Sequence, residues 1–150
     1  MLLLKRTRRR RRLTKYRQIP HTADAAYRIR GESLAEIYVN AAEALMATIT
    51  DRRRLRPRET RLIKVEAPDR EALLVGWLNY LLYLYDVDGF LGRIFDIVEL
   101  SDEGLQALAR GEVYDPARHL AKTAVKAATY HHLEITPRNR GWQATVILDL

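Results

Sequence analysis

The stretch "EALLVGWLNYLLYLYDVDG", residues Glu71 to Gly89, predicts one long helix that is apolar on more than one face. Pro68 and Asp69 precede it as a helix start, and Gly89 can adopt the left-handed conformation that ends a helix. Such a helix needs partners on several sides, so we expect it at the centre of the protein. The apolar positions that predict this are Leu73, Leu74, Trp77, Leu78, Leu81, Leu82 and Tyr85.

The same helix contains the longest apolar run, Ala72 to Tyr85, which Gly76 and Asn79 interrupt. The run falls short of the ~20 residues needed to cross a bilayer, so it predicts a core helix and no membrane partner. Near the start of the chain only Leu2 to Leu4 are consecutively apolar, too few for the core of a secretory signal. The chain has no cysteine, which excludes disulfides and thiolate chemistry. We expect a cytoplasmic protein.

Strands are predicted on both sides of this helix. "TRLIKVEA" before it alternates in side-chain type, and "FLGRIFDIVEL", Phe90 to Leu100, is rich in β-branched and aromatic residues. Further upstream, "SLAE" (Ser33 to Glu36) has the spacing of a capping box and predicts a second helix that runs to about Thr50. Its apolar residues form one stripe, which needs a sheet to lie on.

Four more segments have strand patterns: around Tyr16 to Ile19, Ala26 to Arg30, Lys122 to Ile135, and Gly141 to Leu150. "PRNRG" between the last two has the residues of a hairpin turn, whereas Ser101 to Leu120 has no clear pattern apart from a turn at "YDPARH". We therefore predict an α+β domain, in which two helices pack on a mainly antiparallel sheet of about six strands.

The positive charge is unevenly distributed. The net charge is +7, but residues 1–15 hold 8 of the 26 basic residues and no acid, so residues 16–150 carry 18 basic and 19 acidic side chains. We expect residues 1–15 to form a basic, disordered arm and residues 16–150 to form the single folded domain. The arm is either a tail that contacts RNA phosphates non-specifically or a solvated extension.

Common enzyme classes are excluded by motif. The only serines are Ser33, which the helix cap uses, and Ser101, which lacks the glycines of a nucleophile elbow. Neither glycine-rich phosphate-binding motif is present. "DVDG" imitates part of a calcium-binding loop, but positions one and twelve of that loop would be Leu84 and Phe95, which offer no oxygen ligand.

The four histidines, His21, His119, His131 and His132, lack the spacing of a zinc site. Strand alternation places Tyr130 and His132 on one face of the predicted strand, and Thr129 and His131 on the other. For each histidine we expect an ordinary hydrogen-bonded side chain.

Two aspartates stand at predicted strand ends: Asp24 in "PHTAD" near the first strands, and Asp149 in the terminal "TVILDL". Alternation puts Asp149 on the face of Thr145 and Ile147, where it is either exposed at the rim or held by a cation. If the first and last strands were neighbours, Asp24, Asp149 and Leu150 could together offer oxygen ligands to Ca²⁺ or Mg²⁺.

The chain resembles the archease family over essentially all of residues 16–150. The stretches that carry the resemblance are "HTAD", "GESLAEIYVNAAEALMATITD", "EALLVGWLNYLLYLYDVDGFL", "DPARH", "VKAATYHHLEI" and "GWQATVILDL". Their order and spacing make the combination specific, although "HTAD" alone would be weak.

The resemblance implies a non-enzymatic cofactor of the tRNA-splicing RNA ligase, which joins RNA ends bearing a 2′,3′-cyclic phosphate or 3′-phosphate to 5′-hydroxyl ends. Archeases promote guanylylation of the ligase's active-site histidine, allow multiple turnover and can broaden its nucleotide choice. The family's metal site maps onto Asp24, Asp149 and Leu150, and its metal is calcium, with magnesium or manganese as other divalent candidates. His21, Lys126, Thr129, Tyr130 and His131 are weaker candidates for the same neighbourhood or for a ligase-facing surface.

Two other functions compete with this interpretation. An RNA-binding module would hold tRNA through the arm and through basic residues such as Arg52, Arg53, Arg54 and Arg56. A general chaperone would expose an apolar face to unrelated clients, which nothing in the sequence requires. Deletion of residues 1–15 and replacement of Asp149 discriminate between the ligase cofactor and the RNA-binding module.

Overall fold

The computed structural model describes residues 14–19 and 24–150 of the chain. In chain order its elements are β1 (Tyr16–Ile19), β2 (Asp24–Gly31), α1 (Leu34–Ile49), a 3₁₀ turn (Arg52–Arg54), β3 (Glu59–Glu66), α2 (Arg70–Asp88), β4 (Phe90–Leu100), β5 (Gly104–Val113), β6 (Ala127–Arg138) and β7 (Gly141–Asp149). The predicted basic arm lies outside these residues except for Thr14 and Lys15.

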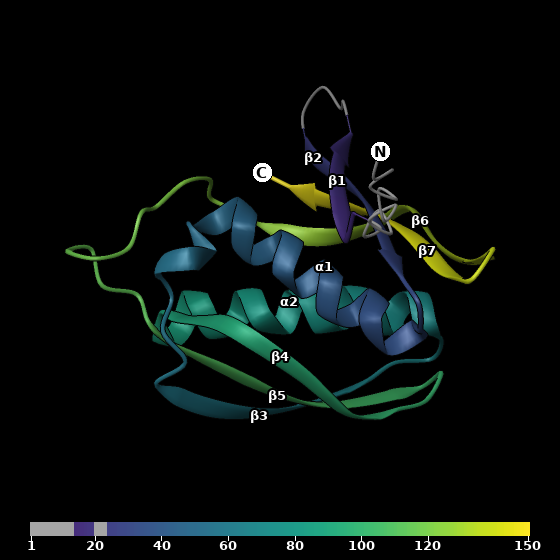
Figure 1. Ribbon diagram of the computed structural model, residues 1–150, viewed down its shortest axis with the longest axis horizontal. Coiled ribbons are helices and arrows are strands. Elements are labelled where there is room, and N and C mark those ends of the chain that lie inside the picture. The colour runs from purple at the N-terminus through teal and green to yellow at the C-terminus, as the bar shows by residue number, and fades with distance from the viewer. Residues whose placement is uncertain (1–13, 20–23) are drawn as a thin grey trace, which may run out of the picture.

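The described residues form three layers, with both helices between two antiparallel sheets (Figure 1). One sheet has the strand order β1-β2-β7-β6 and the other β3-β5-β4. The predicted α+β class with two helices is confirmed. The strands number seven within the described part of the chain and divide into two sheets, whereas we predicted about six in one sheet.

The central position of α2 is confirmed, and its cause is the apolar surface around the helix. Trp77 is fully buried, donates its indole N–H to the Tyr38 carbonyl of α1 at 2.9 Å, and meets Phe95 of β4 edge to face at 5.9 Å. One hydrophobic core therefore runs from sheet to sheet through the helices. Among the described residues, no helix is both long and apolar enough to cross a bilayer.

The helix ends form largely as their sequences predict. Ser33 caps α1, since its hydroxyl accepts the Glu36 amide at 3.2 Å. The reciprocal half of the capping box differs, because the Glu36 carboxylate accepts the amide of Glu32 and not that of Ser33. Asp69 caps α2, and Gly89 ends it at φ +71°, a conformation that favours glycine.

The strand β5 lies in the segment that the sequence left unassigned. Its buried positions are Leu105, Ala107, Ala109, Gly111 and Glu112, and the alanines and glycine among them have weak β propensity. Strand β6 begins at Ala127 and not at Lys122, because residues 114–126 form an irregular connection between β5 and β6.

Candidate metal site and its supports

Strand pairing brings the two predicted acids together. Strands β2 and β7 are antiparallel neighbours, and their register places Asp24 directly opposite Asp149. Both residues are half-buried and share the outer face of the sheet, away from the helices, because the residues that alternate with them, Ala25 and Leu148, lie in the core. Ala127 of β6 lies on the other side of Asp149.

Two carboxylates in this arrangement suit a hard cation. Directly opposite residues of antiparallel strands have Cβ atoms about 4.5–5.5 Å apart, so two negative charges there repel each other unless a cation lies between them. Leu150 follows Asp149 and adds backbone oxygen. Among the described residues, no group of three or more His, Cys, Asp or Glu gathers in a metal-type cluster. Asp24, Asp149 and Leu150 can thus supply only part of the 6–8 oxygen ligands that calcium takes, and backbone carbonyls and water would supply the rest.

The weaker site candidates lie at different distances from the acids. The Lys126 amide donates to the Asp149 carbonyl at 2.8 Å, and the Lys126 side chain is exposed. Thr129 pairs with Ile147, one same-face position along β7 from Asp149. His21 lies outside the described residues.

The predicted alternation of the two strand histidines is wrong. Between Thr129 and Glu134 the β6–β7 register shifts, so that residues 130–133 bulge opposite a single β7 residue. His132 has φ +56°, and its ring lies 3.9 Å from that of His131. The bulge cancels strict alternation, and both histidines and Tyr130 are exposed in it, opposite a β7 position three residues from Asp149.

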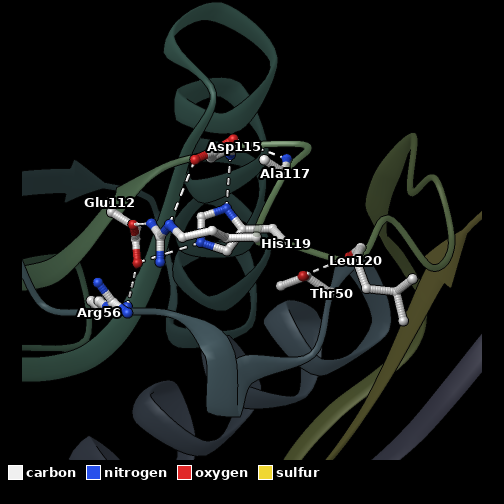
Figure 2. Close-up of polar contacts among 8 residues, drawn as sticks. Thr50, Arg56, Glu112, Asp115, Ala117, His119 and Leu120 are labelled. Carbon is white, nitrogen blue, oxygen red and sulfur yellow. Dashed lines mark hydrogen bonds and ion pairs between the residues drawn. The ribbon is translucent and has the colours of Figure 1, made fainter.

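A buried polar cluster anchors the connection that leads to Lys126 (Figure 2). Glu112 at the end of β5 is 5% exposed, and its carboxylate accepts the Arg56 amide at 2.5 Å and pairs with the Arg118 guanidinium. His119 is also buried, with its Nε2 3.4 Å from the Glu112 carboxylate. His119 Nδ1 accepts the Asp115 amide at 2.8 Å, so the proton of the neutral ring is on Nε2, facing Glu112.

Hydrogen bonds hold Glu112 in its charged form. Burial by itself raises the pKa of a carboxyl group, but the Arg56 amide, Arg118 and His119 together outweigh it and hold the pKa of Glu112 below its ordinary value. Glu112 is therefore a buried negative charge that is paired with Arg118.

Beyond the cluster, the connection is fixed to the end of α1. The Leu120 carbonyl accepts the Thr50 hydroxyl at 2.6 Å (Figure 2), and the amides of Lys122 and Thr123 donate to the Ile49 and Thr48 carbonyls. These bonds hold the connection so that the Lys126 amide lies against the Asp149 carbonyl. The expectation that His119 is an ordinary hydrogen-bonded residue is confirmed, whereas Glu112 was missed because it stands in the segment without a strand pattern.

Three of the four arginines that the RNA-module interpretation named, Arg52, Arg53 and Arg54, lie within ion-pair distance of acids of the chain. Arg52 pairs with Glu43 at 3.4 Å, and Arg53 pairs with Asp51 at 3.1 Å. Arg54 lies 4.0 Å from Asp51. Their charge is therefore partly compensated locally.

Comparison with known proteins gives a consistent result. Residues 16–150 match the Archease protein family (MTH1598/TM1083). Protein archease of Methanosarcina mazei is 38% identical over 140 residues, covering 91% of this chain and 96% of that protein. Protein archease of Methanopyrus kandleri is 38% identical over 138 residues, covering 90% and 99%.

Solved structures share the fold. The solution structure of Methanobacterium thermoautotrophicum protein 1598 has a TM-score of 0.77 and 33% identity, covering 91% of this chain and 99% of that one. The crystal structure of an archease, described as a possible chaperone, from Thermotoga maritima has a TM-score of 0.63 and 21% identity, covering 89% and 96%. From its sequence match and its fold, the chain belongs to the archease family.

Proposed function

We propose that this chain is a non-enzymatic activator of the tRNA-splicing RNA ligase. It promotes guanylylation of the ligase's active-site histidine, so that the ligase turns over repeatedly and its choice of nucleoside triphosphate broadens. Membership of the archease family supports this proposal, together with an acid pair suited to a cation at one end of a sheet.

The observation that carries the proposal is the register of Asp24 opposite Asp149. Like charges directly opposite each other destabilise a sheet, so this pairing has a cost that a bound cation removes. In the proposal Asp24, Asp149 and the backbone of Leu150 hold calcium. The calcium ion neutralises the carboxylates when bound, and the chain's own residues fix the ends of β2 and β7 around it.

The ligase-facing surface in this proposal is the exposed edge beside the acids. It consists of Lys126, Thr129 and the bulge, where Tyr130 is 63% exposed and His131 is exposed next to it. No catalytic residue is assigned to this chain. Both of its serines serve the backbone, since the Ser33 hydroxyl accepts the Glu36 amide and the Ser101 hydroxyl accepts the Glu103 amide.

The test is the rate of ligase guanylylation with substoichiometric amounts of the chain. Wild type is compared with Asp24→Asn and Asp149→Asn, which keep the side-chain shape and remove one charge each. Asp96→Asn is the matched control, because Asp96 is an exposed acid on the other sheet, 3.7 Å from Arg110. Folding of every variant is verified by circular dichroism.

We expect wild type and Asp96→Asn to accelerate guanylylation and both acid-pair variants to lose most of the effect. If wild type has no effect on the ligase, the proposal is wrong. If Asp24→Asn and Asp149→Asn activate as well as wild type, the activator role stands and the acid pair has no part in it.

A chaperone function is the second candidate, favoured by one observation. Leu62, Ile94 and Val98 on the β3-β5-β4 sheet are 58%, 40% and 57% exposed. Exposed apolar side chains of this kind can bind unfolded clients. Suppression of aggregation of an unrelated unfolded protein by wild type, and its loss in Leu62→Ser, would favour this function over the activator role.

A further inference from the structure

A polar groove of about 490 Å³ lies at the end of the β1-β2-β7-β6 sheet away from the acids. Figure 1 shows this end as the β6–β7 hairpin, whereas the C-terminus lies at the opposite end of β7. The polar side chains that line the groove are Arg28, Arg30, Arg138, Asn139, Arg140 and Gln143.

The backbone explains why these arginines gather. Arg28 and Arg30 alternate with the core residue Ile29, so they share the outer face of β2. Strand β2 runs alongside β7 to its start, where Arg30 pairs with Gln143. The β6–β7 turn then adds Arg138 and Arg140 beside the end of β2. Arg17 of β1, paired with Arg28, extends the positive surface on the same face.

The four groove arginines have no ion-pair partner within the described residues, unlike arginines such as Arg52, Arg61 and Arg118. Every ion pair found within residues 14–19 and 24–150 involves other cations, so none of these four has a carboxylate partner there. The Nε atom of Arg28 is buried and has no hydrogen-bond acceptor in this part of the chain. Glu134 lies in the same row as Arg28, but Thr145 separates the two.

We infer that this groove binds the phosphate backbone of single-stranded RNA. Same-face neighbours on a strand, such as Arg28 and Arg30, lie about 6.6 Å apart, which suits consecutive phosphates of an extended strand. Guanidinium groups bind phosphate oxygens with two parallel hydrogen bonds. The amides of Asn139 and Gln143 add donors and acceptors for base edges or the 2′-hydroxyl.

An acidic protein segment fits the groove less well. Protein interfaces place apolar and aromatic side chains at their centre. The one large apolar side chain among the lining residues, Trp142, is half-buried and packs against the hydrophobic core. Residues 16–150 as a whole carry slightly more acidic than basic residues, so this cationic surface is a local feature of the folded domain.

The inference stands without the ligase proposal, since it concerns direct contact between this chain and RNA. The experiment measures binding of a fluorescent single-stranded RNA of about 12 nucleotides by anisotropy at several salt concentrations. All proteins are full-length and carry glutamine at Arg8, Arg9, Arg10, Arg11 and Arg12, so that arm binding does not mask the groove.

Two groove variants are compared with one control in this background. The groove variants are Arg28→Gln with Arg30→Gln, and Arg138→Gln with Arg140→Gln. The second pair is on the exposed hairpin, so it remains informative if changes at the half-buried Arg28 disturb folding. The control is Arg53→Gln with Arg54→Gln, which removes the same charge from arginines already near Asp51.

We expect each groove variant to bind RNA roughly tenfold more weakly and the slope of log K against log salt to fall by about 1.4, which is 0.7 per lost phosphate contact. The control should keep the slope of its parent. Equal affinity and slope in parent and groove variants would overturn the inference. So would equally tight binding of a poly-glutamate peptide that the same variants lose, because the groove would then be a site for acidic protein.

Discussion

The two ends of the outer face of the β1-β2-β7-β6 sheet differ in charge and in how they are built. The acid end joins Asp24 and Asp149, 125 positions apart, and depends on the β5–β6 connection to bring Lys126 alongside. The arginine end is made by the short β6–β7 turn against the end of β2. Both ends therefore depend on the pairing of β2 with β7, and only the acid end depends in addition on the anchored β5–β6 connection.

The largest expected effect comes from uncoupling the acid end through its buried anchor. Glu112→Gln removes the buried charge that pairs with Arg118 and replaces one acceptor oxygen with an N–H₂ group, which then faces other donors. We expect the free energy of unfolding to fall by about 3 kcal/mol. Urea denaturation measures this, and the exposed Glu99→Gln is the control.

Glu112→Gln should affect the two ends of the sheet differently. Calcium affinity at the acid end, measured by titration calorimetry on the folded variant, should weaken because residues 114–126 lose their anchor. RNA affinity at the arginine end should stay unchanged. If Glu112→Gln lowers the calcium affinity and the RNA affinity equally, the anchor does not act on the acid end alone.

The next effect concerns the charge pair itself. Calcium that binds only the folded chain at 100 times its dissociation constant adds about 2.7 kcal/mol to the free energy of unfolding. Asp149→Asn should lose this gain. In the presence of EDTA the same variant should be more stable than wild type by about 0.5 kcal/mol, because two like charges no longer face each other.

The difference in stability between Asp149→Asn and wild type should change sign between calcium and EDTA. This reversal identifies a cation between the acids. Thermal unfolding with calcium and with EDTA measures both halves of the prediction, and Asp96→Asn should follow wild type in both. An Asp149→Asn protein that gains as much stability from calcium as wild type would place the ion elsewhere.

The buried anchor of the acid end makes stability depend on pH. Burial raises the pKa of Glu112 in the folded chain, but the hydrogen bond from the Arg56 amide and the contacts with Arg118 and His119 outweigh it and lower the pKa below its ordinary value of 4.5. Its stabilising contribution is therefore present above the unfolded pKa and is lost as the pH falls through the folded pKa. Urea unfolding from about pH 6 to about pH 3 should show wild type losing more stability than Glu112→Gln. If both proteins lost stability with falling pH at the same rate, Glu112 would not be the source of the pH dependence.

The sequence predicted those parts of the molecule in which local pattern and tertiary structure agree. The apolar surface of α2 and its end at Gly89 are encoded in contiguous residues, so both were predictable. The meeting of Asp24 with Asp149 was not, since it depends on which strands become neighbours. The family resemblance supplied that expectation, and the register between β2 and β7 agrees with it.

The errors have physical reasons of their own. Strand β5 was missed because Ala107, Ala109 and Gly111 are small to fit a closely packed sheet, which removes the β-branched signal. The faces of His131 and His132 were wrong because a bulge leaves no trace in a period-two pattern. The arginine groove was missed because its arginines come from two separate segments of the chain and lack acidic partners only in the folded structure. Counting charges along the sequence does not reveal either property.

The smallest expected change in the free energy of unfolding is at the arginine end, where the backbone of one groove arginine is strained. Arg140 has φ +68° in the β6–β7 turn, a conformation that costs a side chain with a Cβ about 1–2 kcal/mol. Glycine removes this strain but has more freedom in the unfolded chain, which offsets part of the gain. We therefore expect Arg140→Gly to raise the free energy of unfolding by roughly 0.5 kcal/mol and, at the same time, to weaken RNA binding.

Opposite changes in stability and binding distinguish a functional residue from a structural one. Arg138→Gln, at the neighbouring strand position, should weaken RNA binding without a gain in stability, because Arg138 is not among the described residues with positive φ. Arg140→Asn, which tolerates the left-handed region, should also lose RNA affinity. If Arg140→Gly gains stability and keeps full RNA affinity, the arginine at this turn has no part in the groove. If it loses stability, the turn needs the side chain for packing, and strain at Arg140 is not the price of a binding site.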